Sequence, residues 1–194
     1  MTDFKTTVEL LERALTQMGE VIAAIGAEQS EWPTPCEGWG VHTLVRHVVG
    51  QDLRNFAMSA RGETVDWRAP AEELHGDWAA QFRTGAAALL EVWRGADHSV
   101  PAGADDAPLR NRLDQQIAEL AMHAWDLARA TDQRITLDPE LAEHGLAWSR
   151  QMLRPEFRGP DKAFGFEVAV APDAPAYDRL AGWFGRDPDW KSPH

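Results

Sequence analysis

The chain from Gln115 to Ala130 contains neither proline nor glycine, and apolar residues recur through it at intervals of three or four. This interval is the period of one face of an α-helix. The apolar positions of that face are Leu113, Ile117, Leu120, Ala124 and Leu127. The pattern predicts a helix from about Leu109 to Ala130 that packs this face against a core, after a polar connection that begins at Asp97.

A second row of side chains lies one step around the same predicted helix. Gln116, Glu119, His123 and Asp126 are spaced three, four and three residues apart, so they share a face beside the apolar one. A carboxylate and an imidazole four residues apart, next to a buried surface, are placed to hold a metal ion or to pass a proton. This row is therefore the first candidate for chemistry.

Helical spacing predicts three earlier helices, over residues 3–25, 40–60 and 71–94. Pro70 supplies the start signal of the third of these, because proline is favoured at the first helical position. Asp138, Pro139 and Glu140 predict the start of a further helix, with an N-cap, a proline at the first position and an acid in the first turn. That helix should end before Pro155.

The C-terminal part differs from the rest in its pattern. Phe164, Phe166, Val168 and Val170 alternate with other residues, which predicts a short extended segment. The sequence PAYDRLAGWFGR then predicts a short helix closed by Gly185. Taken together, the patterns predict one all-α domain over residues 1–194, a helical bundle in which residues 155–194 form an irregular C-terminal wrap.

Composition narrows the classes of partner. The 194 residues are 44% hydrophobic and 26% charged, as in ordinary globular proteins, and the formal net charge is −12. The 19 lysines and arginines do not cluster, which argues against binding to nucleic acids or to anionic membranes. There is no apolar run of membrane-spanning length, no signal-peptide pattern and only one cysteine, so we expect a cytoplasmic protein.

Each candidate residue also has a plain structural interpretation. Glu119 and His123 fit two metal ligands on one helix, but their spacing alone favours a solvated ion pair. His47, beside the buried face of the second helix in a row with Gln51 and Arg54, fits a third ligand or a histidine bonded to a backbone carbonyl. Asp126 fits an acceptor that orients His123, or a surface acid near the end of its helix.

Cys36 lies in the loop before the second helix. It fits a reactive thiol, but a small packed residue is the favoured interpretation.

Three stretches of the sequence together resemble one known family. TPCEGWGVHTLVRHVVG, from Thr34 to Gly50, is similar to the signature of the mycothiol-dependent maleylpyruvate isomerase N-terminal family, within the DinB/YfiT-like metalloenzymes. ELAMHAWDLARATDQ, from Glu119 to Gln133, is similar to that family's second metal motif. DAPAYDRLAGWFGRDP, from Asp173, is like the tail of a compact actinobacterial branch.

The resemblance implies a fold and a set of ligands. It implies a DinB-like four-helix bundle, here with an additional helix, that binds a divalent metal, often zinc, through three side chains. The family's motif residues fall on His47, Glu119 and His123. Characterised isomerases of this type carry a larger C-terminal domain, whereas this sequence ends at His194. Homodimers occur among the relatives.

The resemblance also implies thiol chemistry. The hypothesis is a metal-dependent enzyme that uses mycothiol or another low-molecular-weight thiol, as a thiol S-transferase or an isomerase acting on an electrophilic small molecule. Asp126 would orient His123, and Arg54 or Arg129 would bind an acidic group of the substrate. The alternatives are a stress or regulatory bundle that binds a metal or ligand without turnover, and a plain scaffold that binds no metal.

Overall fold

The computed structural model describes residues 4–95, 107–159, 162 and 164–194, and the regular elements within them are all helices, as predicted. Its helices are α1 (Phe4–Ala23), α2 (Val41–His47), α3 (Leu53–Ala60), α4 (Trp78–Gly95), α5 (Ala107–Ala130), α6 (Pro139–Met152) and α7 (Ala176–Trp183). Within the described residues there is no strand, only two isolated β-bridges. The polar connection predicted from Asp97 falls mostly outside the described residues.

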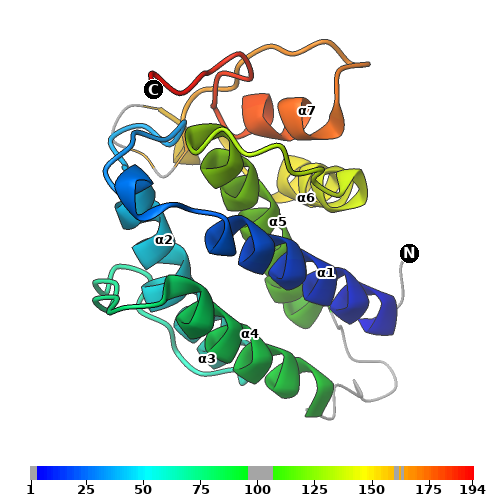
Figure 1. Ribbon diagram of the computed structural model, residues 1–194. Helices are drawn as coiled ribbons and strands as arrows, with labels where there is room; N and C mark the ends of the chain where they lie inside the picture. Colours follow the sequence, from blue (N-terminus) through cyan, green and yellow to red (C-terminus); the bar gives the residue numbers. More distant parts are fainter. Residues whose placement is uncertain (1–3, 96–106, 160–161, 163) are drawn as a thin grey trace.

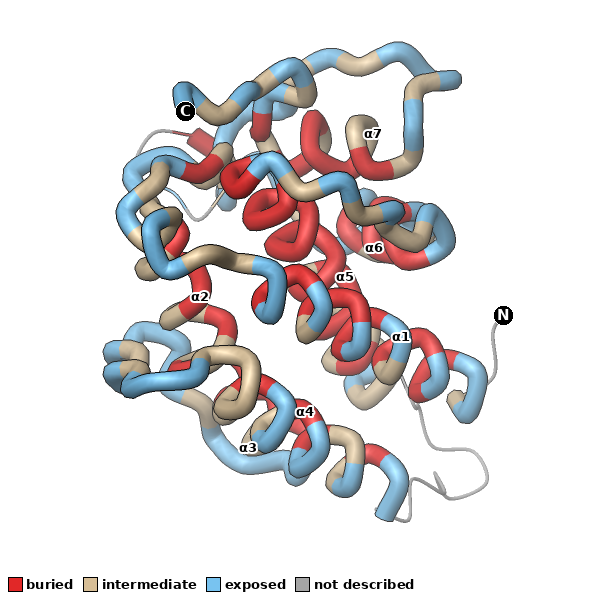
Figure 2. The backbone as a smooth tube through the Cα atoms, viewed as in Figure 1, coloured by how far each residue is buried: buried red, intermediate tan, exposed pale blue. Residues whose placement is uncertain are grey.

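Helix α5 is the centre of the molecule (Figure 1). Helices α1, α2, α3 and α4 form the bundle with it on one side, and α6 and α7 pack on the other. Figure 2 shows that buried backbone concentrates along α5, as a helix with neighbours on several sides requires. The predicted apolar face is fully buried: Leu113, Ile117, Leu120, Ala124 and Leu127. Gln116, His123 and Asp126 are buried as well.

The start of α6 confirms the prediction made from Asp138, Pro139 and Glu140. The Asp138 side chain accepts a hydrogen bond from the backbone N–H of Glu140 at 3.0 Å, and Pro139 occupies the first helical position. Arg13 of α1 forms ion pairs with both Asp138 and Glu140. The cap therefore also ties the first helix of the bundle to α6.

The predicted helix over residues 40–60 is interrupted by a π-helical segment, Val48–Asp52. Gly50 lies inside it, where the backbone N–H of Glu72 donates to the Gly50 carbonyl at 3.1 Å. A Cβ atom at Gly50 would lie 2.5 Å from the Glu72 carbonyl oxygen. Glycine is needed here because another backbone segment crosses the helix at close range.

Helix α4 begins at Trp78, so the prediction of a helix from residue 71 was wrong. Asp77 supplies the N-terminal cap, with its side chain accepting from the Ala80 N–H at 2.9 Å. Residues 71–77 instead run across the π-helical segment, where Glu72 bonds to Gly50. Tertiary contact with α2 and α3 outweighs the start signal of Pro70.

The extended segment predicted over residues 164–170 forms no strand. Phe164 makes one isolated bridge to Arg158, and the Phe166 side chain is two-thirds exposed. Val168 donates to the carbonyl of Gly182, so this part of the chain follows α7 rather than another strand. Alternation here does not reflect a sheet with one buried face.

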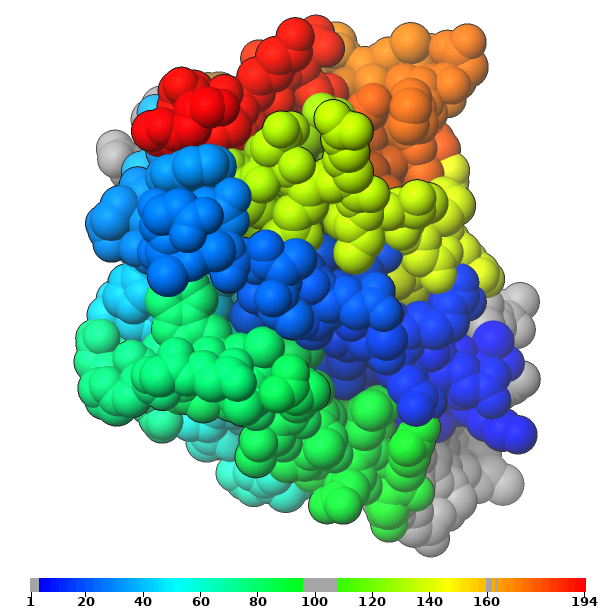
Figure 3. Space-filling view, viewed as in Figure 1, coloured from blue at the N-terminus to red at the C-terminus, as the bar shows by residue number. Residues whose placement is uncertain are grey.

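The C-terminal segment covers one end of the bundle. The rings of Trp32 and His194 stack with their centroids 4.7 Å apart, and in Figure 3 the last residues (red) lie against the loop that follows α1 (blue). Among the described helices none has the length and apolar character needed to cross a membrane.

Candidate metal centre

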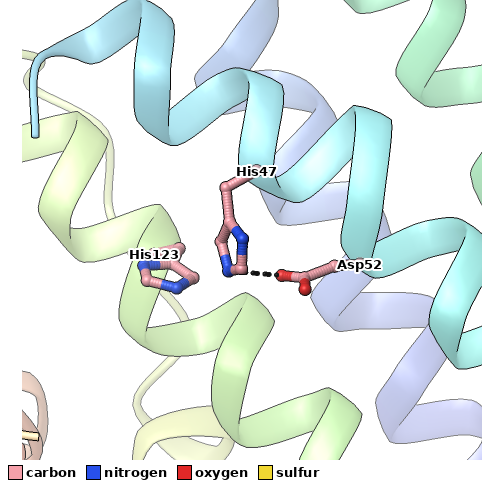
Figure 4. A group of neighbouring side chains, drawn as sticks. All are labelled: His47, Asp52 and His123. Carbon is pink, nitrogen blue, oxygen red and sulfur yellow. Dashed lines mark ion pairs between the residues drawn. The ribbon is translucent and has the colours of Figure 1, made fainter. Parts of the chain in front are cut away.

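Three side chains meet between α2 and α5 (Figure 4). His47 is the last residue of α2, Asp52 ends the π-helical segment, and His123 lies in α5. One ligand atom of each residue lies within 4.8 Å of the others. Nε2 of His47 is 3.2 Å from Oδ2 of Asp52, and the two imidazole rings are 5.4 Å apart at an angle of 88°. Among the described residues, two imidazoles and a carboxylate thus form one compact cluster.

The π-helical segment brings Asp52 to this point. In an α-helix, residues five apart are separated by about 140° around the axis, so Asp52 and His47 would face different directions. A π-helix bonds residue i to residue i+5 and has a wider turn, which brings the side chain of residue i+5 back to the side of residue i. The helix irregularity is therefore what completes the cluster.

Hydrogen bonding fixes the tautomer of His47. Its Nδ1 lies 2.8 Å from Oε1 of Gln51. Nε2 of Gln51 donates to the carbonyls of Trp67 and Ala69, at 3.1 and 2.7 Å, so the amide orientation is determined by its partners. Since an amide oxygen only accepts, Nδ1 of His47 carries the proton, and the Nε2 lone pair faces Asp52.

His123 is held in the same way. Its Nδ1 lies 3.0 Å from Oδ2 of Asp126, and its Nε2 lies 3.6 Å from Oε2 of Glu119. A carboxylate acceptor on Nδ1 leaves the Nε2 lone pair pointing to the side where Glu119 lies. Glu119 and His123 are thus adjacent, as expected for residues four apart on one helix.

Asp126 is completely buried, and burial alone would raise the pKa of its carboxyl. The positive charge of Arg186, together with the hydrogen bond from His123, outweighs burial and holds the pKa of Asp126 below its ordinary value. Nε of Arg186 is 3.4 Å from Oδ1 of Asp126, and Nη2 is 3.2 Å from Oδ2. Asp126 therefore remains a carboxylate that accepts from His123.

Burial pushes two members of the cluster toward their uncharged forms. It lowers the pKa of His47 to about 4, with a further contribution from His123 nearby. It raises the pKa of Asp52 well above its ordinary value, and the charge of Glu119 adds to this. A neutral imidazole is the form that binds metal ions.

The other polar residues that the sequence singled out bond to partners outside the cluster. Arg54 forms an ion pair with Glu72 at 3.0 Å, and Arg129 lies 3.4 Å from Asp178. Their assignment as substrate contacts stays a prediction, and it would require those carboxylates to be displaced. Gln116, at the other end of the polar row, accepts a hydrogen bond from the indole N–H of Trp93 at 2.9 Å.

Cys36 lies beside Arg186, which donates to its sulfur at 3.5 Å. Burial raises the pKa of this thiol to about 11, although Arg186 opposes the shift. The sulfur is then a thiol rather than a thiolate at neutral pH, which supports the packed interpretation over the reactive one.

The sequence interpretation missed Asp52 and Arg186. The spacing of five between His47 and Asp52 carries no helical signal. Arg186 lies in the C-terminal stretch that resembles the family, but nothing in its spacing relates it to Asp126. The only local hint was Gly50, a helix-weakening residue in the middle of a helical pattern.

Comparison with known proteins adds two findings. The family described as the mycothiol maleylpyruvate isomerase N-terminal domain matches residues 11–128, which include the whole cluster. Two proteins of Mycobacterium tuberculosis, uncharacterized protein MT0763 of strain CDC 1551 / Oshkosh and uncharacterized protein Rv0738 of strain ATCC 25618 / H37Rv, are each 32% identical over 182 residues. The alignments cover 90% of this chain and 94% of each relative. No solved structure matches at a significant level. The chain belongs to the mycothiol maleylpyruvate isomerase N-terminal domain family.

Proposed function

We propose that the chain is a metal-dependent enzyme that activates a low-molecular-weight thiol for reaction with an electrophilic small molecule. His47, Glu119 and His123 would hold a divalent metal ion, with zinc as the first candidate and Asp52 as a further oxygen ligand beside them. The observation that carries the proposal is the orientation of the two imidazoles. Each uses Nδ1 in a hydrogen bond to a fixed acceptor, which leaves Nε2 of His47 facing Asp52 and Nε2 of His123 facing Glu119.

The donor set fits zinc chemistry. Two imidazole nitrogens and a carboxylate form one of the usual three-ligand sets of catalytic zinc sites, which keep a position open for water or substrate. The imidazoles are supported by Gln51 and Asp126, as metal-bound histidines usually are. The depressed pKa of His47 keeps its ring neutral, so no proton competes for Nε2 near neutral pH.

The family membership supports a thiol as the second component, and mycothiol is the thiol that the family's name gives. A bound divalent cation would lower the pKa of a thiol in its open position, so that the sulfur is a nucleophilic thiolate at neutral pH. The protein's residues would keep the site partly shielded, since Asp52 and His123 are buried and His47 is mostly so. The reaction would be S-transfer, or isomerisation by addition and elimination.

The metal site is tested by metal analysis of protein purified without chelator. We expect close to one zinc per chain in the wild type and a loss of most of it in His47→Ala and His123→Ala. His144→Ala is the matched control, because His144 is a half-buried histidine with a carboxylate partner, Asp114 at 2.8 Å, outside the cluster. Equal metal content in all four proteins would reject the site.

The enzyme is distinguished from a protein that only binds metal by a thiol-depletion assay. Mycothiol and other cellular thiols are each incubated with a panel of electrophiles, and the free thiol is followed with and without zinc-loaded protein. We expect zinc-dependent consumption that is fastest with mycothiol and is lost in His123→Ala. Zinc binding without consumption of any thiol would favour the non-catalytic alternative.

A further inference from the structure

We infer that Arg186 is a positioning residue for His123, acting through Asp126. Its guanidinium would hold the Asp126 carboxylate in the one orientation that accepts from Nδ1 of His123, and so keep Nε2 available at the cluster. The link to metal binding rests on the proposed function. The effect on the His123 imidazole itself is a property of the metal-free protein and can be tested separately.

Each nitrogen of the Arg186 guanidinium donates a hydrogen bond within the protein. Nε and Nη2 bond to the two oxygens of Asp126, Nη1 donates to the Phe184 carbonyl at 3.0 Å, and Nη2 also reaches the sulfur of Cys36. The residue is 9% exposed, and Asp126 is 0% exposed. A planar guanidinium that contacts both carboxylate oxygens restricts the rotation of the carboxylate, which a single donor would not.

The backbone after α7 aims Arg186 at α5. The N–H of Gly185 donates to the carbonyl of Gly182 at 3.0 Å, and the N–H of Arg186 donates to that of Ala181 at 2.9 Å. This pair of bonds is a Schellman motif, and Gly185 takes its left-handed position with φ of 83°. The predicted glycine stop therefore does more than end α7, because it fixes the direction of the next side chain.

Arg186 lies outside residues 11–128, which the family match covers. Asp126 and His123 are inside that range, so the proposed ligand and its acceptor belong to the shared domain while the group that holds the acceptor comes from the C-terminal segment. The inference thus assigns residues after α6 a part in organising the site, beyond covering one end of the bundle.

The test compares Arg186→Met with Arg179→Met. Arg179 also follows α6, is mostly buried, and pairs with the half-exposed Glu143 without contacting the cluster, so its loss controls for removing a mostly buried arginine and its ion pair from this segment. Long-range ¹H–¹⁵N spectra of metal-free protein report the tautomer of His123, assigned by its loss in His123→Ala. Zinc affinity is measured by competition with a chromophoric chelator.

We expect His123 to be in the Nδ1–H form in wild type and Arg179→Met, and to gain a clear Nε2–H fraction in Arg186→Met. The zinc dissociation constant should rise about 10- to 100-fold in Arg186→Met, the usual effect of removing a group that supports a metal ligand, and much less in Arg179→Met. Arg186→Lys, which restores the charge but not the two-point contact, should be intermediate in both measurements.

An unchanged His123 tautomer in Arg186→Met would overturn the inference, and so would a zinc affinity equal to that of Arg179→Met. If wild-type protein binds no zinc, the proposed function fails, and the tautomer measurement still decides the inference. If Arg186→Met does not fold, Arg186→Lys is compared with Arg179→Lys, and equal tautomer populations in that pair overturn it.

Discussion

Asp52 and Asp126 are two buried carboxyl groups whose surroundings shift their pKa in opposite directions. The fold raises the pKa of Asp52, so its ionisation costs stability at any pH above its unfolded pKa, and this cost grows until the folded pKa is reached. The fold lowers the pKa of Asp126, so its carboxylate stabilises the protein above its unfolded pKa. The same substitution at the two positions should therefore change stability in opposite directions.

In metal-free protein at neutral pH we expect Asp52→Asn to raise the free energy of unfolding by about 1–3 kcal/mol, since it removes a poorly paired buried acid. Asp126→Asn should lower it by about 3–5 kcal/mol, because Arg186 is left buried without its counter-charge. Both differences should shrink as the pH falls toward the pKa of an unfolded aspartate. Urea unfolding at a series of pH values measures them, and a destabilised Asp52→Asn at neutral pH would contradict the burial argument.

Gln51 should support metal binding although it contacts no metal. Gln51→Ala removes the acceptor that holds His47 in its Nδ1–H form, and we expect zinc affinity to fall about 10- to 100-fold. Gln81→Ala is the control, since Gln81 also donates its amide to a loop carbonyl, that of His75, but bonds to no histidine ring. Calorimetric titration with zinc compares the two, and equal affinities would mean that Gln51 serves only the loop.

At the residue scale, the sequence was informative where side chains obey the α-helical period. Gln116, Glu119, His123 and Asp126 follow that period in α5, and Asp126 bonds to His123, which is one of the two interpretations that the spacing left open. Asp52 could not be found, because its alignment with His47 depends on a π-helical turn that no simple spacing rule signals. Arg186 could not be found either, because it meets Asp126 through tertiary packing across 60 positions.

At the scale of the elements, the helix carrying His47 and Asp52 depends on the crossing of residues 71–77. That crossing explains Gly50, and it also explains why the start signal at Pro70 is not used. The segment is needed against the π-helical turn, where Glu72 bonds to Gly50 and the preceding Ala69 bonds to Gln51. Helix α4 therefore begins only at the next cap, Asp77. A sequence pattern contains the caps but not the contact that selects between them.

Gly50→Ala should therefore destabilise the protein even though alanine is the better helix former. The added Cβ would meet the Glu72 carbonyl oxygen at 2.5 Å, and backbone cannot move aside cheaply. We expect a loss of about 1–3 kcal/mol from overpacking. In Gly19→Ala, within α1, the new Cβ would lie 3.4 Å from the Phe82 ring, an ordinary contact, and a gain of about 0.5–1 kcal/mol is expected.

Chemical denaturation of the two glycine variants measures this difference. A Gly50→Ala protein as stable as Gly19→Ala would show that residues 71–77 do not press on the π-helical turn. Zinc affinity of Gly50→Ala adds a second readout, since a displaced turn would also move Asp52.

At the scale of the whole molecule, the candidate site joins parts of the bundle that are distant in sequence. His47 comes from the end of α2, His123 from the middle of α5, and the acceptor of His123 is held by the chain after α7. The all-α bundle and most helix bounds followed from periodicity, because the apolar period of a long amphipathic helix can be recognised in its sequence. The order in which they pack, and the return of the C-terminal segment to α5, did not.

Because the proposed ligands lie on separate helices, zinc should stabilise the folded protein as a whole. A ligand at about 100 times its dissociation constant adds about 2.7 kcal/mol if it binds only the folded state. For a domain of this size that corresponds to a rise in melting temperature of roughly 5–10 °C. We expect this rise in wild type and in His144→Ala, and little of it in His123→Ala. The rise should diminish as the pH is lowered, since protons then compete for the imidazole nitrogens. Differential scanning calorimetry with zinc and with chelator measures it, and an equal rise in His123→Ala would mean that the stabilising zinc ion binds elsewhere on the chain.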